Sequence, residues 1–176
     1  MAHGILNASK MASKDVDSWV RPAYSGSALD NGNVVQLLGK SALSGYGEVW
    51  LGTAPTSASA TDCWMVNEPP IPALTSGTNT YNGIGVITDF YVSASTVFTA
   101  VKLQKGDIIQ LSVDNLDSAT AQAYAVPVLG TFKFAWAAAA STGLSLRYLK
   151  TTTIPYANGS IGSSSITMYE FEVIGN

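Results

Sequence analysis

The sequence predicts an all-β fold, a compact β-sandwich or β-barrel of short antiparallel strands with an extended N-terminal arm. Three observations support this prediction. Short apolar runs rich in β-branched and aromatic residues recur along the chain. Turn-forming residues separate these runs at intervals of about 8–12 residues. Strong helix signals are missing, because the alanine-rich stretch at 135–141 ends before Gly143, after about two turns at most.

The predicted strands follow one another along the chain. They span 16–24, 34–38, 49–51, 62–66, 85–92, 98–103, 108–113, 124–129, 132–136, 144–153 and 166–174. Pro22 interrupts the first of them, which favours an edge strand, because proline cannot donate a hydrogen bond to a neighbouring strand. The strands on either side of Gly130 are expected to pair as a hairpin.

The chain divides into an N-terminal arm at 1–19 and a β-rich body at 20–176. The first 14 residues are too few to form a stable helix alone, so we expect the arm to order against the body or a partner. Residues 67–83 are rich in Pro, Ser, Thr, Gly and Asn. We expect them to form a long surface loop, at which the body can divide into two halves.

The stretch LDNGNVV at 29–35 places four turn-forming polar residues between two apolar runs. A calcium loop of the EF-hand type needs oxygen ligands at alternate positions and a glutamate at the end of the loop. After Asp30, the next carboxylate is Glu48, which is too distant for that pattern. Asn31 and Gly32 instead suit the central positions of a type I′ turn, where φ is positive. We therefore interpret the stretch as a tight turn.

Composition argues against several classes of function. Charged residues make up 12% of the chain, hydrophobic residues 47%, and the formal net charge is -3 at pH 7. We expect no nucleic-acid binding, because basic clusters are missing, and no membrane span, because no apolar run reaches about 18 residues. The N-terminus lacks a signal-peptide pattern, and the single Cys63 cannot form an internal disulfide. A protein made inside a cell and packed against other proteins fits best.

Residues suited to catalysis or metal binding are scarce. His3 is the only histidine, and it lies in a terminus that we expect to be mobile, which disfavours a Ser-His-Asp or Cys-His site. Zinc sites need several histidines and cysteines. The closely spaced acidic pairs are Asp15/Asp17, Asp114/Asp117 and Glu170/Glu172. The first and third pairs are expected on solvated strand faces, and the second fits a turn. We expect no enzyme activity, no catalytic residues, no cofactor and no metal.

Tryptophans raise the alternative of a surface that stacks against sugars. The chain has Trp19, Trp50, Trp64 and Trp136. Most of them lie in apolar strand contexts, which favours core or interface positions. A carbohydrate-binding module therefore stays open as the weaker alternative. A small hydrolase, which needs paired acids in a cleft, and a barrel that carries an apolar ligand also stay open.

The order of several stretches carries a resemblance. HGILNASKMAS leads to LDNGNVVQLLG, then to GEVWLGTAPT and DCWMVNEPP, and finally to DFYVSASTVFTAVKLQKGDIIQLSVDNL. This order resembles small virion proteins encoded beside the major capsid protein gene in tailed bacteriophages and prophages, which are taken to be head decoration, or cement, proteins. The resemblance covers most of residues 4–116 and is only a β-rich character after Tyr124. This chain is poorer in Lys and Glu and has longer Ser/Thr/Gly-rich loops.

The resemblance implies a structural virion protein on the outer surface of the capsid, made in the bacterial host cytoplasm. The expected partner is the major capsid protein, whose shell the chain would stabilise as a homo-oligomer, with a trimer as one option. The residues that we expect to contact the capsid are Ile5, Leu6, Met11 and Trp19. The departures from the family pattern keep an alternative open, a carbohydrate- or host-surface-binding module such as a head fibre or spike component.

Overall fold

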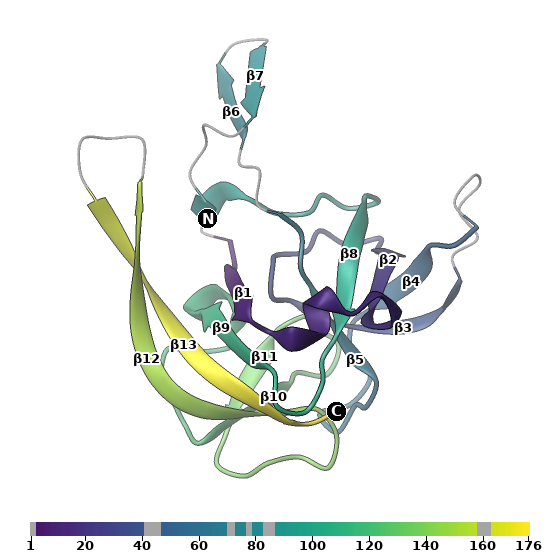
Figure 1. The fold of residues 1–176 in the computed structure, drawn as a ribbon, viewed down its shortest axis with the longest axis vertical. Helices are drawn as coiled ribbons and strands as arrows, with labels where there is room; N and C mark the ends of the chain where they lie inside the picture. The colour runs from purple at the N-terminus through teal and green to yellow at the C-terminus, as the bar shows by residue number, and fades with distance from the viewer. Residues whose placement is uncertain (1–2, 41–46, 70–72, 77–78, 83–86, 158–162) are drawn as a thin grey trace.

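A computed structural model describes residues 3–40, 47–69, 73–76, 79–82, 87–157 and 163–176, and it confirms the all-β prediction. Five strands close a barrel in the order β2 (Val20–Tyr24), β4 (Trp50–Thr53), β3 (Val34–Lys40), β5 (Cys63–Val66) and β8 (Val97–Lys102). Six strands form a sheet in the order β1 (Leu6–Lys10), β9 (Ile108–Ser112), β13 (Ser163–Gly175), β12 (Ser145–Ala157), β10 (Tyr124–Pro127) and β11 (Phe134–Ala137). Figure 1 shows the barrel and the sheet side by side.

Shorter elements complete the described part of the chain. A hairpin pairs β6 (Ala73–Ser76) with β7 (Asn79–Asn82). The 3-10 helices are η1 (Ala12–Asp15), η2 (Asp17–Trp19), η3 (Ile87–Asp89) and η4 (Val113–Asn115). Each is a single short turn, so strands carry the architecture.

Strand β5 lies between two apolar cores, and all four of its residues are buried. Trp64 and Val66 belong to the cluster inside the barrel. Cys63 and Met65, which point the opposite way, belong to the cluster between the barrel and the six-stranded sheet. A strand buried on both faces has no polar side, which explains why the sequence CWMV is uniformly apolar.

The barrel contains β2, although the sequence predicts an edge strand there. β2 pairs with β8 on one side and, in parallel, with β4 on the other. Pairing with β4 begins only at Ala23, so the missing N–H of Pro22 faces no partner in β4. The proline is therefore compatible with a closed barrel.

The predicted strand at 85–92 is wrong in its described part. Residues 87–89 form η3, and Val92 makes only an isolated bridge with Leu29. Residues 85–86 lie outside the described part of the chain. The apolar side chain of Val92 is still buried, 5% exposed, so its contribution to the core does not require a strand.

The N-terminal segment is an integral strand of the sheet. β1 pairs antiparallel with β9, and the N–H of Ser112 donates to the carbonyl of Ile5 at 3.0 Å. Ile5 is 8% exposed and Met11 is 1% exposed, and Met11 joins the core between barrel and sheet. Of the predicted arm, β1 is extended, whereas η1 and η2 are 3-10 helices, and of the two expected outcomes the segment orders against the body.

The predicted hairpin around Gly130 is present. β10 and β11 pair antiparallel on either side of it, and Gly130 has a φ of 71°.

The segment 67–83 contains the β6–β7 hairpin, while residues 70–72, 77–78 and 83 lie outside the described part. The two sheets do not divide at this segment, because β8 follows it and closes the barrel, while β1 precedes it and belongs to the sheet.

Strands β12 and β13 are longer than the predicted strands, at 13 residues each. β9 pairs with β13 only from Met168 to Glu172, and β10 reaches only the start of β12. Within the part of the chain that the structure describes, residues 153–157 and 163–167 therefore pair only with each other. We call them the distal ribbon. In Figure 1 the ribbon and the β6–β7 hairpin extend toward the same end of the molecule.

The Asp30–Asn33 stretch is a turn, as predicted, but not a type I′ turn. The N–H of Asn33 donates to the carbonyl of Asp30 at 3.1 Å. Gly32 has a φ of 86°, whereas Asn31 is not among the residues with positive φ. Positive φ at the second central residue alone is the pattern of a type II turn. The turn connects Leu29 to the barrel strand β3 instead of closing a two-strand hairpin.

Asparagine side chains hold this turn against the sheet. Asn31 donates to the carbonyl of Glu68 and accepts from its N–H, each at 2.8 Å. The fully buried Asn115 donates to the carbonyl of Asn31 at 2.8 Å. A Cβ on Gly32 would lie 2.9 Å from Asn115 Nδ2, and one on Gly4 would lie 2.4 Å from it. Glycine at these two positions permits the close packing.

Glu170 is buried, 4% exposed, although the sequence places it on a solvated face. Its Oε2 accepts hydrogen bonds from Gln110 at 2.8 Å and Lys10 at 3.2 Å, and Lys150 Nζ lies 3.7 Å from its Oε1. Burial alone raises the pKa of Glu170, but the hydrogen bonds from Gln110 and Lys10 hold it below its usual value. The carboxylate thereby links β1, β9 and β12 to β13.

Replacing Glu170 with Gln tests this link. We expect Glu170→Gln to lower the free energy of unfolding at pH 7 by about 1–3 kcal/mol, because charge-assisted hydrogen bonds are lost. The native pKa is depressed, so the wild-type advantage is present above the unfolded-state value near 4.5 and is lost as pH falls through the native pKa. Urea denaturation over a pH series measures this, with the exposed Glu48→Gln as control. A pH-independent difference would contradict the assignment.

Gly143 marks a close approach of two backbone segments. A Cβ there would lie 2.3 Å from the carbonyl oxygen of Ser59 and 2.4 Å from that of Ala60. The next residue, Leu144, donates its N–H to the Ala60 carbonyl at 2.7 Å. Neither backbone segment can move aside without disturbing this hydrogen bond.

We therefore expect Gly143→Ala to lower the free energy of unfolding by about 1–3 kcal/mol through overpacking. Gly26→Ala is the matched control, because a Cβ on Gly26 meets nothing within 4 Å. Chemical denaturation of both variants measures the effect. If Gly143→Ala and Gly26→Ala are equally stable, the backbone at Ser59 and Ala60 can shift to accommodate the added Cβ without a cost in stability.

Candidate functional site

The structure places the four predicted capsid-contact residues in different environments. Ile5 and Met11 are buried within this chain, so their side chains do not face a partner. Leu6 is half-buried against the core, and Trp19 is half-buried at the end of η2. Capsid contact by these residues stays a prediction, and Leu6 and Trp19 are the two with accessible surface.

Leu6 also lines an apolar groove of about 300 Å³ between β1 and the distal ribbon. Ile154 and Ile166 of the ribbon form the opposite wall, and Ile87 of η3 contributes from the side. The groove joins the N-terminal segment to the ribbon as one apolar surface.

A larger cleft of about 650 Å³ opens where four segments meet. The N-terminus, the turn before β3, the region around η4 and the loop between β10 and β11 contribute to it. Its lining residues are His3, Ala28, Asp30, Asn33, Asp114, Asp117, Val128, Gly130, Thr131, Phe132 and Lys133. Its size falls within the range of roughly 300–1,000 Å³ that is usual for small-molecule sites.

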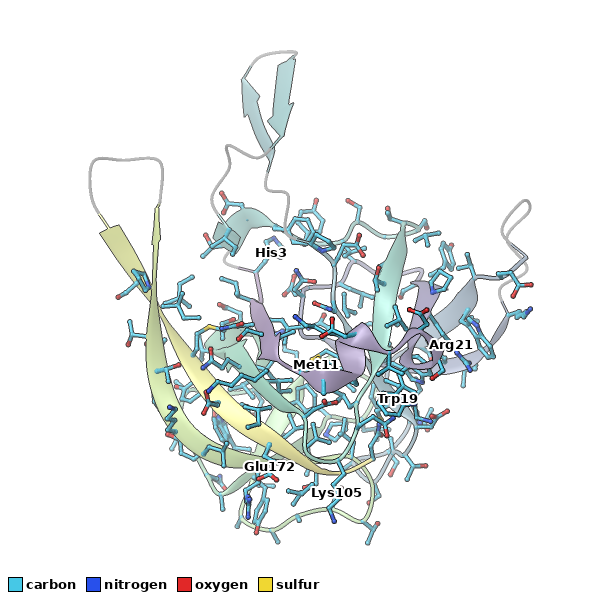
Figure 2. All side chains as sticks on the ribbon, in the orientation of Figure 1. His3, Met11, Trp19, Arg21, Lys105 and Glu172 are labelled. Carbon is cyan, nitrogen blue, oxygen red and sulfur yellow. The ribbon has the colours of Figure 1, made fainter. Side chains whose placement is uncertain are left out.

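His3 is held firmly, although the sequence suggests a mobile terminus. Its Nδ1 lies 2.7 Å from Asp30 Oδ1, and the backbone N–H of His3 donates to the carbonyl of Thr88 at 2.8 Å. The imidazole also stacks on Tyr91, with ring centroids 4.6 Å apart and planes 20° apart. Figure 2 shows His3 beside η3. The three contacts fix one wall of the cleft.

The acidic residues of the cleft have different partners. Asp30 is paired with His3, and Asp117 accepts a hydrogen bond from the backbone N–H of Trp136 at 3.2 Å. Among the described residues, no side chain hydrogen-bonds to the Asp114 carboxylate, which accepts a hydrogen bond from its own backbone N–H. Burial raises the pKa of Asp114, and the charge of Asp30 raises it further, while the charges of Lys133 and His3 and the backbone hydrogen bond oppose the shift.

The cleft is better suited to binding than to covalent catalysis. Its lining contains one hydroxyl, that of Thr131, which donates to the carbonyl of Val128 at 3.4 Å. Cys63 lies outside the cleft, and burial raises the pKa of its thiol to about 12, which keeps it protonated. Within the ranges that the structure describes, no group of three or more His, Cys, Asp or Glu side chains is placed to hold a metal.

The tryptophans are mainly structural. Trp64 is 2% exposed and Trp136 is 7% exposed, and Trp136 Nε1 donates to the carbonyl of Ser118 at 2.9 Å. The guanidinium of Arg21 lies 4.1 Å from the ring of Trp50 and 4.9 Å from that of Trp64. The ring face of Trp50 is therefore occupied by its own chain, which disfavours a tryptophan platform for sugars.

The fold defines the class of the protein, a two-layer all-β protein in which a closed barrel packs on a curved sheet. No family model matches the chain, and neither a curated protein nor a solved structure matches it. No helix in the described part of the chain is long and apolar enough to cross a membrane.

Sequence reasoning missed the cleft because its residues are far apart in the chain. Each of these polar residues, taken alone, fits an ordinary turn, so the sequence gives no reason to group them into a site. They are Asp30, Asn33, Asp114 and Asp117. Only the packing of η4 against the turn before β3 brings them together, through the hydrogen bond from Asn115 to Asn31. No spacing rule in the sequence encodes that contact.

Substitution of Asp114 tests the electrostatics of the cleft. The native state binds the Asp114 proton more tightly than the unfolded chain, so stability rises as pH falls through the raised native pKa toward 3.8. We expect Asp114→Asn to be more stable than the wild type at pH 7, because it removes a partly buried charge. The advantage should vanish near pH 3.8.

Thermal unfolding over a pH series measures this difference, with the exposed Asp17→Asn as the matched control. A variant that is less stable than the wild type at pH 7 would show that attraction to Lys133 and His3 outweighs burial.

Proposed function

We propose that this chain is a structural virion protein that decorates a tailed-phage capsid and stabilises it by binding the outer surface of the major capsid protein shell. The resemblance of residues 4–116 to head decoration proteins motivates the proposal. The structural observation that carries it is the distal ribbon, a projecting β surface without charge.

The distal ribbon has the properties of a contact element. Its sequences, TIPYA at 153–157 and SSSIT at 163–167, contain no charged residue. Among the described residues its two strands pair only with each other, so each has a backbone edge that no described strand covers. Proteins usually protect such edges with charges or with covering elements, because bare edges pair with other chains. A two-stranded ribbon is only marginally stable alone in water, which favours a partner.

The N-terminal segment extends this contact surface. Leu6 faces the apolar groove beside the ribbon. Trp19 is half-buried, and Val16, between η1 and η2, is 36% exposed. We therefore assign the shell contact of residues 1–19 to Leu6, Val16 and Trp19, while Ile5 and Met11 anchor the segment to its own sheet.

Decoration of a capsid requires many weak contacts and no catalytic site. Repeated binding along a shell raises the overall affinity through multivalency, even when each contact is weak. A homo-oligomer increases this effect, and a trimer is one arrangement compatible with it. A charge share of 12% also lowers the cost of desolvating the contact surface.

Quantitative mass spectrometry of purified particles from the source of the chain tests the proposal. We expect a copy number comparable to that of the major capsid protein, or a simple fraction of it. A few copies per particle would instead assign the chain to a fibre, spike or tail component. Absence from the particles would refute a virion role.

A binding assay with particles that lack the chain tests the ribbon itself. Thr151→Lys/Thr153→Lys places two charges on exposed positions at its base, and we expect at least a tenfold loss of particle binding, about 1.4 kcal/mol or more. Ser118→Lys/Ala121→Lys adds the same charges to an exposed loop and should bind normally. Co-sedimentation measures both, and equal binding would exclude the ribbon as the contact.

A further inference from the structure

The large cleft contains a buried donor without a partner. Asn33 is 5% exposed and lines the cleft. Its Oδ1 accepts the N–H of Asp30 at 2.9 Å, which fixes the orientation of the side-chain amide. Its Nδ2 has no hydrogen-bond partner among the described residues. Buried amide groups are normally satisfied, so an unpartnered donor on a residue that lines the cleft supports ligand binding there.

The cleft also contains an acceptor without a side-chain partner, the carboxylate of Asp114. Asp30 and Asp117 are already engaged by His3 and by the N–H of Trp136. Lys133 lines the same cleft and is in no ion pair that the described residues form. A ligand that supplies an acceptor for Asn33 and a donor for Asp114 would complement both groups.

This pairing discriminates among chemical classes of ligand. An ammonium group could donate to Asp114, but it has no acceptor for Asn33. A carboxylate or phosphate could accept from Asn33, but Asp30, Asp114 and Asp117 would repel it. A hydroxyl group both donates and accepts, and it carries no charge. Several hydroxyls on one ring satisfy donors and acceptors on different walls of the cleft.

The remaining lining suits the carbon skeleton of such a ring. Ala28, Val128 and the half-buried Phe132 provide an apolar wall beside the polar groups. Apolar walls with a few convergent polar groups are the usual design of small-molecule sites. We propose that the cleft between His3, Asp30, Asn33, Asp114 and Phe132 binds a neutral saccharide unit through hydrogen bonds from its hydroxyl groups.

The site does not depend on the ribbon, since no ribbon residue lines the cleft. The proposal also does not depend on the tryptophans that the sequence suggests as a sugar platform. It goes beyond the decoration role, and particle binding and saccharide binding can therefore fail separately.

Saturation-transfer NMR on the full chain tests the proposal. The probes are the methyl glycosides of glucose, galactose, mannose, rhamnose and N-acetylglucosamine. Butylammonium and butyrate serve as matched cationic and anionic probes of similar apolar content. We expect at least one glycoside to bind with a dissociation constant on the order of 1 mM, and neither ion to bind as well.

Two variants locate the binding. Asp114→Ala removes the carboxylate that no described side chain engages, and Thr131→Trp fills the cleft from an exposed lining position without altering its charged groups or Asn33. We expect each to weaken glycoside binding about tenfold or more. Asp17→Ala, which removes an exposed charge outside the cleft, should bind like the wild type. Amide spectra of each variant confirm folding.

Three results would overturn the proposal. The first is the failure of every glycoside to bind. The second is binding that survives both Asp114→Ala and Thr131→Trp, which would place the sugar elsewhere. The third is preferential binding of butylammonium or butyrate, which would assign the cleft to a charged ligand.

Discussion

The burial of β5 on both faces is the constraint on which the rest of the structure depends. Trp64 and Val66 fill the barrel, while Cys63 and Met65 fill the space between the barrel and the sheet. Full burial of each large apolar side chain contributes about 1.5–3 kcal/mol. Separating the barrel from the sheet would expose one face of this strand completely. The two sheets therefore form a single cooperative unit, and elements placed by either sheet are fixed relative to the other.

The asparagine network transmits this rigidity to the surface. Asn115, at the end of η4, reaches from the sheet to the turn before β3, and Asn31 continues the link to Glu68 after β5. Buried amides that are hydrogen-bonded on both sides specify one arrangement of the segments that they join. The wall that contains Asp30 and Asn33 is thereby held against the wall that contains Asp114. The cleft is a consequence of how barrel and sheet are joined.

The sequence predicted the elements whose signals are local and failed where packing decided the outcome. Turn residues and alternation identify the β10–β11 hairpin, because Gly130 and the flanking apolar runs specify it without distant contacts. The run at 85–92 is predicted as a strand, yet among its described residues only Val92 forms a β-bridge, an isolated one with Leu29. The alanine-rich stretch beginning at 135 has a high helix propensity, yet the strand predicted at 132–136 is right for Ala135 and Trp136. They lie in β11, where Trp136 completes an aromatic core with Tyr169 and Phe171.

The contact surface and the cleft were predictable to different degrees for the same reason. The uncharged Ser/Thr run of the ribbon is visible in the sequence, but its projection follows from β9 and β10 being too short to cover β12 and β13. The N-terminal residues Ile5 and Met11 look like free apolar side chains until β1 is paired with β9. The partner of β1 is about a hundred positions away in the chain, and such distant pairings have no local sequence signal. From its sequence alone, an apolar terminal segment can be expected either to dock on a partner or to complete its own sheet. Here it completes the sheet, because β1 pairs with the otherwise open edge of β9.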